Sequence, residues 1–392
     1  MYASAPGKIL WIGGYSVLEK GNISFVTGVD KRVYAKADRL GSGNIHIVSK
    51  QFGIDISGGF DGSKITFSRN MSEDEKKYSK FVVTAAETSL RYLKYKGCDV
   101  SGIYLETISD PAFGFGGTKS GLGSSAAVTT AVTGAIFELH GMKIEKNLDL
   151  IHKMAQYIHF RAQGKVGSGF DIAASCFGGH AYSRYSPDLI KDIPENASIE
   201  QIAGTVEKKW DYTAEKIGMP DNFIVAMGNF VGTSASTSEM VKKINEWKAT
   251  NTDAYKKLMH DMDESNKEAI RHLREINNGN KEAMEKFRHA FREGRALTKK
   301  LGDLSGAPIE TDDFTDIIDK TERNGAFVAK LPGAGGGDKI SAICLSRGDK
   351  ERVEKYWGSC EIKKIQPTPV STSNSGLRSE PEKAYKEAEE WL

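Results

Sequence analysis

The segment "KSGLGSSAAVTTAVTGAIFELHG", residues 119–141, joins a glycine-rich stretch to a regular apolar pattern. Apolar residues recur at helical spacing from Val128 to Leu139, which predicts one apolar face of a helix. Ser124 and Ser125 stand where an N-cap belongs, and Gly141 where a helix stops. A helix start offers unpaired N–H groups and about half a positive charge, and glycines let a ligand approach the backbone. The segment therefore predicts an anion site, typically for phosphate, although a glycine turn before a buried helix would have the same pattern.

Two further clusters place a charged side chain beside glycines. In "SAPGKILWIGGYSVLE" (4–19), Lys8 lies at the edge of a predicted strand, either as a cation that faces phosphate or as an ordinary exposed lysine. In "AQGKVGSGFDIAAS" (162–175), Asp171 follows a glycine loop and precedes a helix-like run. It is therefore either a helix N-cap or a carboxylate presented to a ligand.

Two later loops are rich in small residues. "KLPGAGGGDKISAICL" (330–345) has four glycines in five positions before a strand. We expect them to serve a strained turn or a close approach of backbone to a ligand, and not packing. "GNFVGTSASTSEMV" (228–241) is a hydroxyl-rich loop that enters a helix, for which a capping role is the simpler interpretation.

The whole composition narrows the classes of protein to consider. The chain has 392 residues, a formal net charge of +2, 39% hydrophobic and 27% charged residues, which is typical of a soluble globular protein with room for two domains. The small net charge argues against a nucleic-acid partner, and there is no apolar run of about 18 residues that would span a membrane. The N-terminus has no signal-peptide pattern and the four cysteines fit no metal spacing, so we expect reduced thiols, two of them (Cys176 and Cys344) buried, and a cytoplasmic protein. The loop 119–127 matches neither GxxxxGK[ST] nor GxGxxG, which argues against Walker-type ATPases and Rossmann dehydrogenases.

The elements that must position these clusters have mixed order, which predicts an α+β protein. Strands are expected at 8–12, 23–37, 44–49, 102–108, 222–228, 326–331, 340–345 and 361–365. Helices are expected at 74–95, across the apolar pattern after residue 127, at 147–162, and through a long region at 252–302. The proline- and charge-rich stretch 186–220 predicts the domain junction, which gives domains 1–200 and 201–392.

Three of the clusters occur together, and in the same order, in a known family. "PGKILWIGGYSVLE", "KSGLGSSAAVT" and "LPGAGGGDKISAI" resemble the three motifs of the GHMP small-molecule kinases, and the matches span nearly the whole chain. The resemblance implies an N-terminal domain of the ribosomal protein S5 domain 2 type and a C-terminal ferredoxin-like domain, with ATP and an acceptor between them. Within the family, "AQGKVGSGFDIAASCFGG" most resembles the phosphomevalonate kinases of the fungal and archaeal type. Mevalonate kinases tend to carry a metal-binding glutamate eleven residues before the aspartate, where this chain has Phe160, and Gln163 is the nearest polar substitute.

The resemblance implies a set of site residues and ligands. Lys8 and Asp171 would be catalytic, and Ser125 would bind Mg²⁺. The residues implied for ATP are Lys119, Gly121, Leu122, Gly123, Ser124, Ser125, Ala126 and Ala127. The residues implied for 5-phosphomevalonate are Tyr15, Ser16, Lys165, Ser168, Gly169, Ala235, Ser236, Gly335 and Gly336.

The nature of the acceptor decides what Asp171 has to do. A phosphomonoester has a second pKa of about 6, so it is mostly dianionic at neutral pH and needs cations more than a base. Arg161, Lys165 and Arg184 supply positive charge near Asp171 in the sequence, which favours a phosphorylated acceptor. Asp171 is then a base or only an orienting group.

Other activities of the same family remain open at this stage. They are a mevalonate kinase or another kinase with an alcohol acceptor, and diphosphomevalonate decarboxylase. A non-catalytic regulator is a further alternative, and the presence of both Lys8 and Asp171 argues against it. We expect a monomer or a homodimer.

Overall fold

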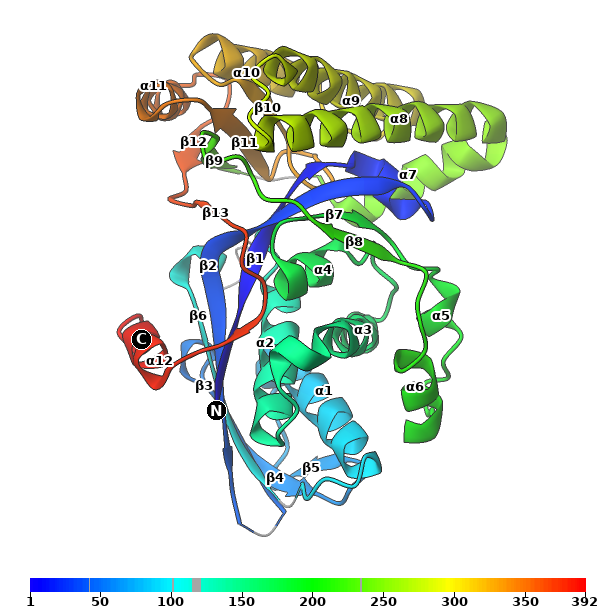
Figure 1. Ribbon diagram of the computed structural model, residues 1–392, viewed down its shortest axis with the longest axis vertical. Helices are drawn as coiled ribbons and strands as arrows, with labels where there is room; N and C mark the ends of the chain where they lie inside the picture. The colour runs from blue at the N-terminus through cyan, green and yellow to red at the C-terminus, as the bar shows by residue number, and fades with distance from the viewer. Residues whose placement is uncertain (42, 101, 115–120, 233–234) are drawn as a thin grey trace.

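Two β-sheets organise the computed structural model, which describes residues 1–41, 43–100, 102–114, 121–232 and 235–392 (Figure 1). In the larger sheet of ten strands, seven follow the order β14-β1-β2-β6-β3-β4-β5, β7 and β13 pair with β2, and β8 pairs with β7. Its pairs are antiparallel except β3 with β6. The strands are β1 Tyr2–Ile12, β2 Ile23–Arg39, β3 Asn44–Ser49, β4 Ile54–Phe60, β5 Ile65–Phe67, β6 Ile103–Ser109, β7 His180–Ser183, β8 Thr213–Lys216, β13 Thr372–Ser373 and β14 Arg378–Ser379.

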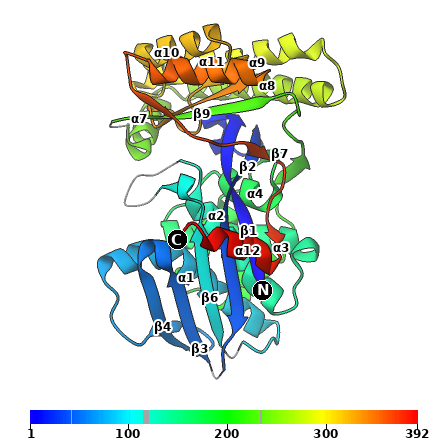
Figure 2. The same ribbon diagram turned by 90° about the vertical axis from the view of Figure 1, so that its left-hand side faces the viewer.

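Helices cover this sheet mainly on one face, where α1 to α4 lie, with α5 and α6 farther out (Figure 1). They are α1 Glu73–Tyr95, α2 Ser124–Leu139, α3 Ile144–Gln163, α4 Phe170–Phe177, α5 Asp188–Lys191 and α6 Ile199–Val206. The 3₁₀ helices Gly14–Leu18 and Lys50–Phe52 connect β1 to β2 and β3 to β4, and Pro111–Phe113 follows β6. The helix α12, Glu382–Glu389, lies on the opposite face, against β2 and β6 (Figure 2).

The helix α2 is the central element of this layer. The predicted single apolar face is wrong, because α2 packs against β1, β2, α1, α3 and α4 and is buried on nearly every side. Its polar positions are compatible with burial because Thr129 and Thr133 donate to the carbonyls of Ser125 and Thr129, each at 2.8 Å. Because these contacts enclose α2, the direction in which its N-terminal amides point is fixed.

The second sheet has four antiparallel strands in the order β10-β11-β9-β12. They are β9 Ile224–Phe230, β10 Val328–Lys330, β11 Lys339–Cys344 and β12 Ile365–Pro367. The helices α8, α9, α10 and α11 lie together with this sheet at one end of the molecule, and α7 lies beside the ends of β1 and β2 (Figure 1). Their bounds are α7 Thr237–Thr250, α8 Thr252–Asn277, α9 Ala283–Ser305, α10 Asp312–Arg323 and α11 Arg347–Gly358.

The last residues of the chain return from the second sheet to the first. After β12, the strands β13 and β14 pair with β2 and β1, and α12 follows (Figure 2). The buried Arg32 holds this segment, because its Nη2 donates to the carbonyl of Gly376 at 2.6 Å. The predicted division at residue 200 lies within α6, and β8 of the first sheet follows it, so the domain bounds stay a prediction.

Most of the predicted elements are confirmed, and the differences have local causes. The helical region expected at 252–302 is confirmed, and it consists of two helices, α8 and α9, with Gly279 at a φ of +86° between them. The strand expected at 361–365 is wrong, since pairing with β9 begins only at Ile365. Gly141, at φ +82°, follows the end of α2 as predicted.

Candidate active site

The glycine loop before α2 places the start of this helix beside β1. Gly123 is the N-cap in a left-handed conformation, with φ +81°, and no side chain caps the helix. The predicted N-cap role of Ser124 and Ser125 is therefore wrong: both serines lie in the first turn, because only glycine adopts this φ without strain. The first intrahelical bond runs from the Ala127 amide to the Gly123 carbonyl at 3.1 Å. The amides of the first turn have no acceptor within the helix and suit an anion.

Buried residues on both sides of Gly123 anchor the loop. Leu122 is fully buried in the apolar core between the two sheets, and its carbonyl accepts the backbone N–H of Lys8 at 2.8 Å. Ala126 and Ala127 are also fully buried, so their small side chains let α2 start close to the sheet. Lys119, predicted to bind ATP, lies outside the described residues.

The side chain of Lys8 lies across this loop. Its Nζ donates to the carbonyl of Gly121 at 3.0 Å, and a Cβ on Gly123 would come within 3.2 Å of the Lys8 side chain. The pairing of β1 with β2 is irregular between Pro6 and Lys8, where the register changes. Burial lowers the pKa of Lys8, and the negative charge of Asp171 opposes this shift. The structure thus confirms that Lys8 and the glycine loop lie together.

Asp171 lies in the first turn of α4, which Gly169 caps in a left-handed conformation. The alternative reading of Asp171 as an N-cap is therefore wrong, because φ of +82° at position 169 requires glycine. Among the described residues, the Oδ1 of Asp171 accepts only the amide of the neighbouring Ile172, at 3.0 Å. Phe170, beside it, lies 5.4 Å from the Nζ of Lys8, measured to the ring centre. Asp171 and Lys8 thus lie on the same side of the glycine loop.

Ser125 has a partner that the sequence analysis did not identify. Its hydroxyl and the Nε2 of His159, on α3, lie 3.0 Å apart. His159 is buried, stacks on Phe81, and has its pKa lowered by burial, so it is neutral at physiological pH. In the tautomer with its proton on Nδ1, the Nε2 of His159 accepts the proton of Ser125, and the lone pairs of the serine oxygen stay available for a metal ion. His159 precedes Phe160, the position at which mevalonate kinases tend to carry the metal-binding glutamate. The sequence gave no signal of the contact between His159 and Ser125.

The residues predicted to bind the acceptor differ widely in accessibility. Ser16 is fully buried, donates to the Gly13 carbonyl at 2.6 Å and accepts from Asn266 at 2.9 Å. The hydroxyl thus holds the turn that follows β1, and the substrate contact of Ser16 stays a prediction. Tyr15 is also buried, and it donates to the Ala334 carbonyl at 2.9 Å, so it ties the first motif to the third.

The loop between α3 and α4 holds the exposed candidates. Lys165 is exposed and Ser168 is partly exposed. Gln163, the substitute for the missing metal ligand, is also exposed and ends α3. The predicted excess of cations is smaller than expected, because Arg161 is paired with Glu195. Arg184 is buried and donates to the carbonyls of Leu18 and Gly167 at 2.8 and 2.9 Å. Its guanidinium therefore joins the first motif to this loop.

In the third glycine loop, the missing Cβ atoms of Gly335, Gly336 and Gly337 face protein atoms, whereas that of Gly333 faces open space. A Cβ on Gly335 would lie 2.5 Å from the carbonyl oxygen of Ile309, and a Cβ on Gly337 2.2 Å from the ring of Phe314. The amides of Gly335 and Gly336 donate to the carbonyls of Pro332 and Ile309. The expectation that these glycines do not serve packing is wrong for Gly335, Gly336 and Gly337, because each allows an atom of the domain core to approach the backbone.

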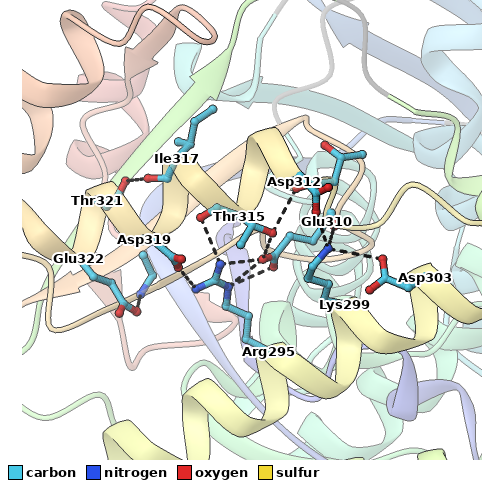
Figure 3. Close-up of polar contacts among 12 residues, drawn as sticks. Arg295, Lys299, Asp303, Glu310, Asp312, Thr315, Ile317, Asp319, Thr321 and Glu322 are labelled. Atoms are coloured by element: carbon cyan, nitrogen blue, oxygen red, sulfur yellow. Dashed lines mark hydrogen bonds and ion pairs between the residues drawn. The ribbon is translucent and has the colours of Figure 1, made fainter.

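An ion network fixes the segment against which this loop packs (Figure 3). Arg295, on α9, donates to Glu310 at 2.7 Å and to Asp319, on α10, at 2.8 Å. Lys299 donates to the Glu310 carbonyl at 3.3 Å. Because Ile309 precedes Glu310 and accepts the Gly336 amide at 2.8 Å, these contacts hold the glycine loop in place.

The hydroxyl-rich loop 228–241 contacts the glycine loop before β11. The amide of Ala235 donates to the carbonyl of Gly336 at 2.9 Å. Ser236 is the N-cap of α7 and accepts from the Glu239 amide at 3.4 Å. The capping role expected for this loop is confirmed at Ser236.

Comparison with known proteins agrees with this geometry. The model of the GHMP kinases N-terminal domain matches residues 80–179, and that of the GHMP kinases C-terminal domain matches residues 269–363. A phosphomevalonate kinase of Saccharolobus solfataricus is 31% identical over 90% of this chain and 92% of its own length. This chain belongs to the GHMP kinase family. A phosphomevalonate kinase of Gibberella zeae is 28% identical over 96% of both chains.

The same fold occurs in a solved GHMP kinase. The structure of the Streptococcus pneumoniae phosphomevalonate kinase in complex with phosphomevalonate and AMPPNP superposes with a TM-score of 0.73 at 18% identity, over 95% of this chain and 100% of that chain. The α+β fold of a GHMP kinase, predicted from the motifs, is thereby confirmed.

The part of this GHMP kinase that the structure describes has neither a membrane-spanning helix nor a cluster of metal-binding side chains. No helix in that part of the chain has the length and apolar character needed to cross a membrane. There, too, no three His, Cys, Asp or Glu side chains form a group that could hold a metal ion. All four cysteines are free thiols, and Cys176 and Cys344 are buried as expected.

Proposed function

We propose that this GHMP kinase transfers the γ-phosphoryl group of ATP to 5-phosphomevalonate, which gives ADP and 5-diphosphomevalonate in the mevalonate pathway of isoprenoid biosynthesis. The observation that carries the proposal is the Lys8 ammonium bonded at 3.0 Å to the glycine loop at the start of a buried helix. Full-length similarity to phosphomevalonate kinases supports the choice of acceptor. Its free thiols suit a cytoplasmic enzyme.

The glycine loop and α2 would bind the phosphates of ATP. Phosphoryl transfer depends chiefly on positioning and on neutralising charge. The amides from Gly123 to Ala126 would donate to phosphate oxygens, and the helix dipole would favour their negative charge. Lys8 would stabilise the charge that develops on the transferred group.

Asp171 would orient the acceptor and Lys8. A phosphomonoester with a pKa of about 6 is mostly dianionic at neutral pH, so no proton has to be removed from the attacking oxygen. The remaining difficulty is repulsion between anions, which the positive charge of Lys8 reduces. The exposed Lys165, with Ser168 and Gly169 beside it, would contact the phosphate of the acceptor.

A magnesium ion fits the residues present. Mg²⁺ in kinases keeps several waters and is bound by few protein groups together with substrate phosphates, so a dedicated cluster of carboxylates is not needed. Ser125 would contribute its hydroxyl oxygen, held by the 3.0 Å contact with His159. When bound, the ion neutralises negative charge on the phosphates.

A panel of acceptors tests the proposal. Coupled ADP release is measured with mevalonate, 5-phosphomevalonate, 5-diphosphomevalonate, homoserine and galactose at equal concentrations. The proposal requires ADP release with 5-phosphomevalonate alone. Release with mevalonate would indicate an alcohol acceptor, and release of ADP with CO₂ from 5-diphosphomevalonate would indicate the decarboxylase; either result would contradict the proposal.

A further inference from the structure

A second lysine, which the motif comparison did not assign, lies against the glycine loop. Lys339 is the first residue of β11 and is only 4% exposed. A Cβ on Gly121 would lie 2.8 Å from the Cε and 3.3 Å from the Cδ of Lys339. Gly121 is therefore enclosed by Lys8 of the first sheet, bonded to its carbonyl, and by Lys339 of the second.

One neutral side chain holds the ammonium group of Lys339. Its Nζ donates to the Oδ1 of Asn229, the residue directly opposite on β9. A lysine has three N–H donors, and Asn229 is the only hydrogen-bond partner of this Nζ among the described residues. The group is thus fixed in direction while donors remain for a ligand.

The charge of Lys339 lacks a compensating ion pair. Neither Lys8 nor Lys339 is within ion-pair distance of a carboxylate in the part of the chain that the structure describes, and the residues outside it include no Asp or Glu. Burial and the positive charge of Lys8 lower the pKa of Lys339 to about 8, while Asp338 opposes the shift. Two partly buried like charges without a counterion are costly unless an anion binds between them.

We propose that Lys339 is a second phosphate-binding cation, supplied by the C-terminal sheet, that contacts the polyphosphate chain of ATP opposite Lys8. This role rests on the proposed kinase function and adds a residue to it. The phosphate chain bound at Gly121 would then be held from both domains.

Binding of AMPPNP with Mg²⁺, measured by isothermal titration calorimetry, tests this role in Lys339→Met and Lys339→Arg. Met keeps the length of the side chain without its charge, and Arg keeps the charge. Lys330→Met is the matched control: Lys330 lies on β10 of the same sheet, burial also lowers its pKa to about 8, and it donates to the Trp11 carbonyl. Thermal unfolding of each variant shows that it is folded.

We expect Lys339→Met to weaken AMPPNP binding about ten- to hundredfold, the loss expected for one charge-assisted hydrogen bond. Lys339→Arg should recover most of the affinity, and Lys330→Met should bind like the wild type. The loss should be smaller for AMP, which lacks the β- and γ-phosphates. Unchanged AMPPNP affinity in folded Lys339→Met would overturn this role alone, whereas no AMPPNP binding by the wild type would contradict the proposed function itself.

The pH dependence of AMPPNP affinity separates a bound cation from a structural lysine. An anion favours the protonated amine, so wild-type affinity should fall above about pH 8, where free Lys339 loses its proton. Among the described residues, the charges that act on Lys339 are those of Lys8 and Asp338, and Asp171 acts on Lys8; all three residues remain in Lys339→Arg. Affinity of Lys339→Arg should therefore fall less than that of the wild type, and an identical fall would contradict the role.

Discussion

The loop before α2 and the loop before β11 are both rich in glycine but face different surroundings. In the loop before α2, the missing Cβ atoms of Gly121 and Gly123 face the side chains of Lys339 and Lys8. In the loop before β11, the missing Cβ atoms of Gly335 and Gly337 face Ile309 and Phe314. In the loop before α2, the backbone lies against two lysine side chains at the start of a helix. In the loop before β11, the backbone lies against the core of its own domain.

This difference shows that glycine content alone does not identify a ligand site. A glycine is required wherever something approaches the backbone closely or φ is positive, and that neighbour can be a ligand or the protein itself. The first loop differs because charged side chains surround it and a helix begins there. The third loop holds its shape through Ile309 and the ion network around Arg295 (Figure 3).

The largest expected effect is in Gly123→Val, compared with Gly141→Val. Both glycines have φ near +80°, at opposite ends of α2, so both variants pay a similar cost in strain of about 1–2 kcal/mol. A side chain at 123 meets Lys8, whereas a Cβ at 141 has nothing within 4 Å. We expect Gly123→Val to abolish AMPPNP binding measured by calorimetry and Gly141→Val to retain it. Equal affinities in the two folded variants would contradict the phosphate-loop assignment.

Asp171→Asn tests the side chains around the first loop. As an orienting group, Asp171 should be replaceable with a loss in kcat of about 10²-fold, the lower end of the range for removing a general base. The residual rate should rise through about pH 6 as the acceptor loses its second phosphate proton. The measurement is kcat against pH with 5-phosphomevalonate. A loss beyond about 10⁴-fold, with both substrates still bound, would show that Asp171 does more than orient.

Gly337→Ala tests the loop before β11. The added Cβ would lie 2.2 Å from the Phe314 ring, with φ at +89°, so we expect the free energy of unfolding in urea to fall by about 1–3 kcal/mol. The affinity of the folded protein for AMPPNP should stay within about twofold of the wild type, because the missing Cβ of Gly337 faces the protein core. Gly53→Ala, with φ +64° and nothing within 4 Å of the added Cβ, is the control for strain alone. A loss of AMPPNP affinity without a loss of stability would remove the distinction between the loops.

Lys165→Ala has the smallest expected effect. Lys165 is exposed, so solvent weakens its attraction to a phosphate. We expect the KM for 5-phosphomevalonate to rise a few-fold while the KM for ATP stays constant. Equal changes in both, or none, would mean that Lys165 is an ordinary surface charge.

The sequence predicted the elements and the first loop well because their signals are local. Helical spacing located α1 and α3, and the glycines before α2 located the loop that lies against Lys8. Contacts between distant segments left no such signal, because the contacts of His159 with Ser125 and of Lys339 with Gly121 exist only in the folded chain. The packing role of Gly337 depends likewise on Phe314, which is distant from any motif.

The most direct test of the central claim is phosphorus NMR of the reaction with Mg²⁺-ATP and 5-phosphomevalonate. Transfer to the acceptor's phosphate forms a diphosphate ester, whose two phosphorus atoms couple to one another. We expect these two coupled signals to grow as the signals of ADP appear and that of the acceptor monoester declines. A new uncoupled phosphomonoester signal would mean transfer to a hydroxyl group, and ADP formed with free phosphate alone would mean hydrolysis; either result would contradict the account.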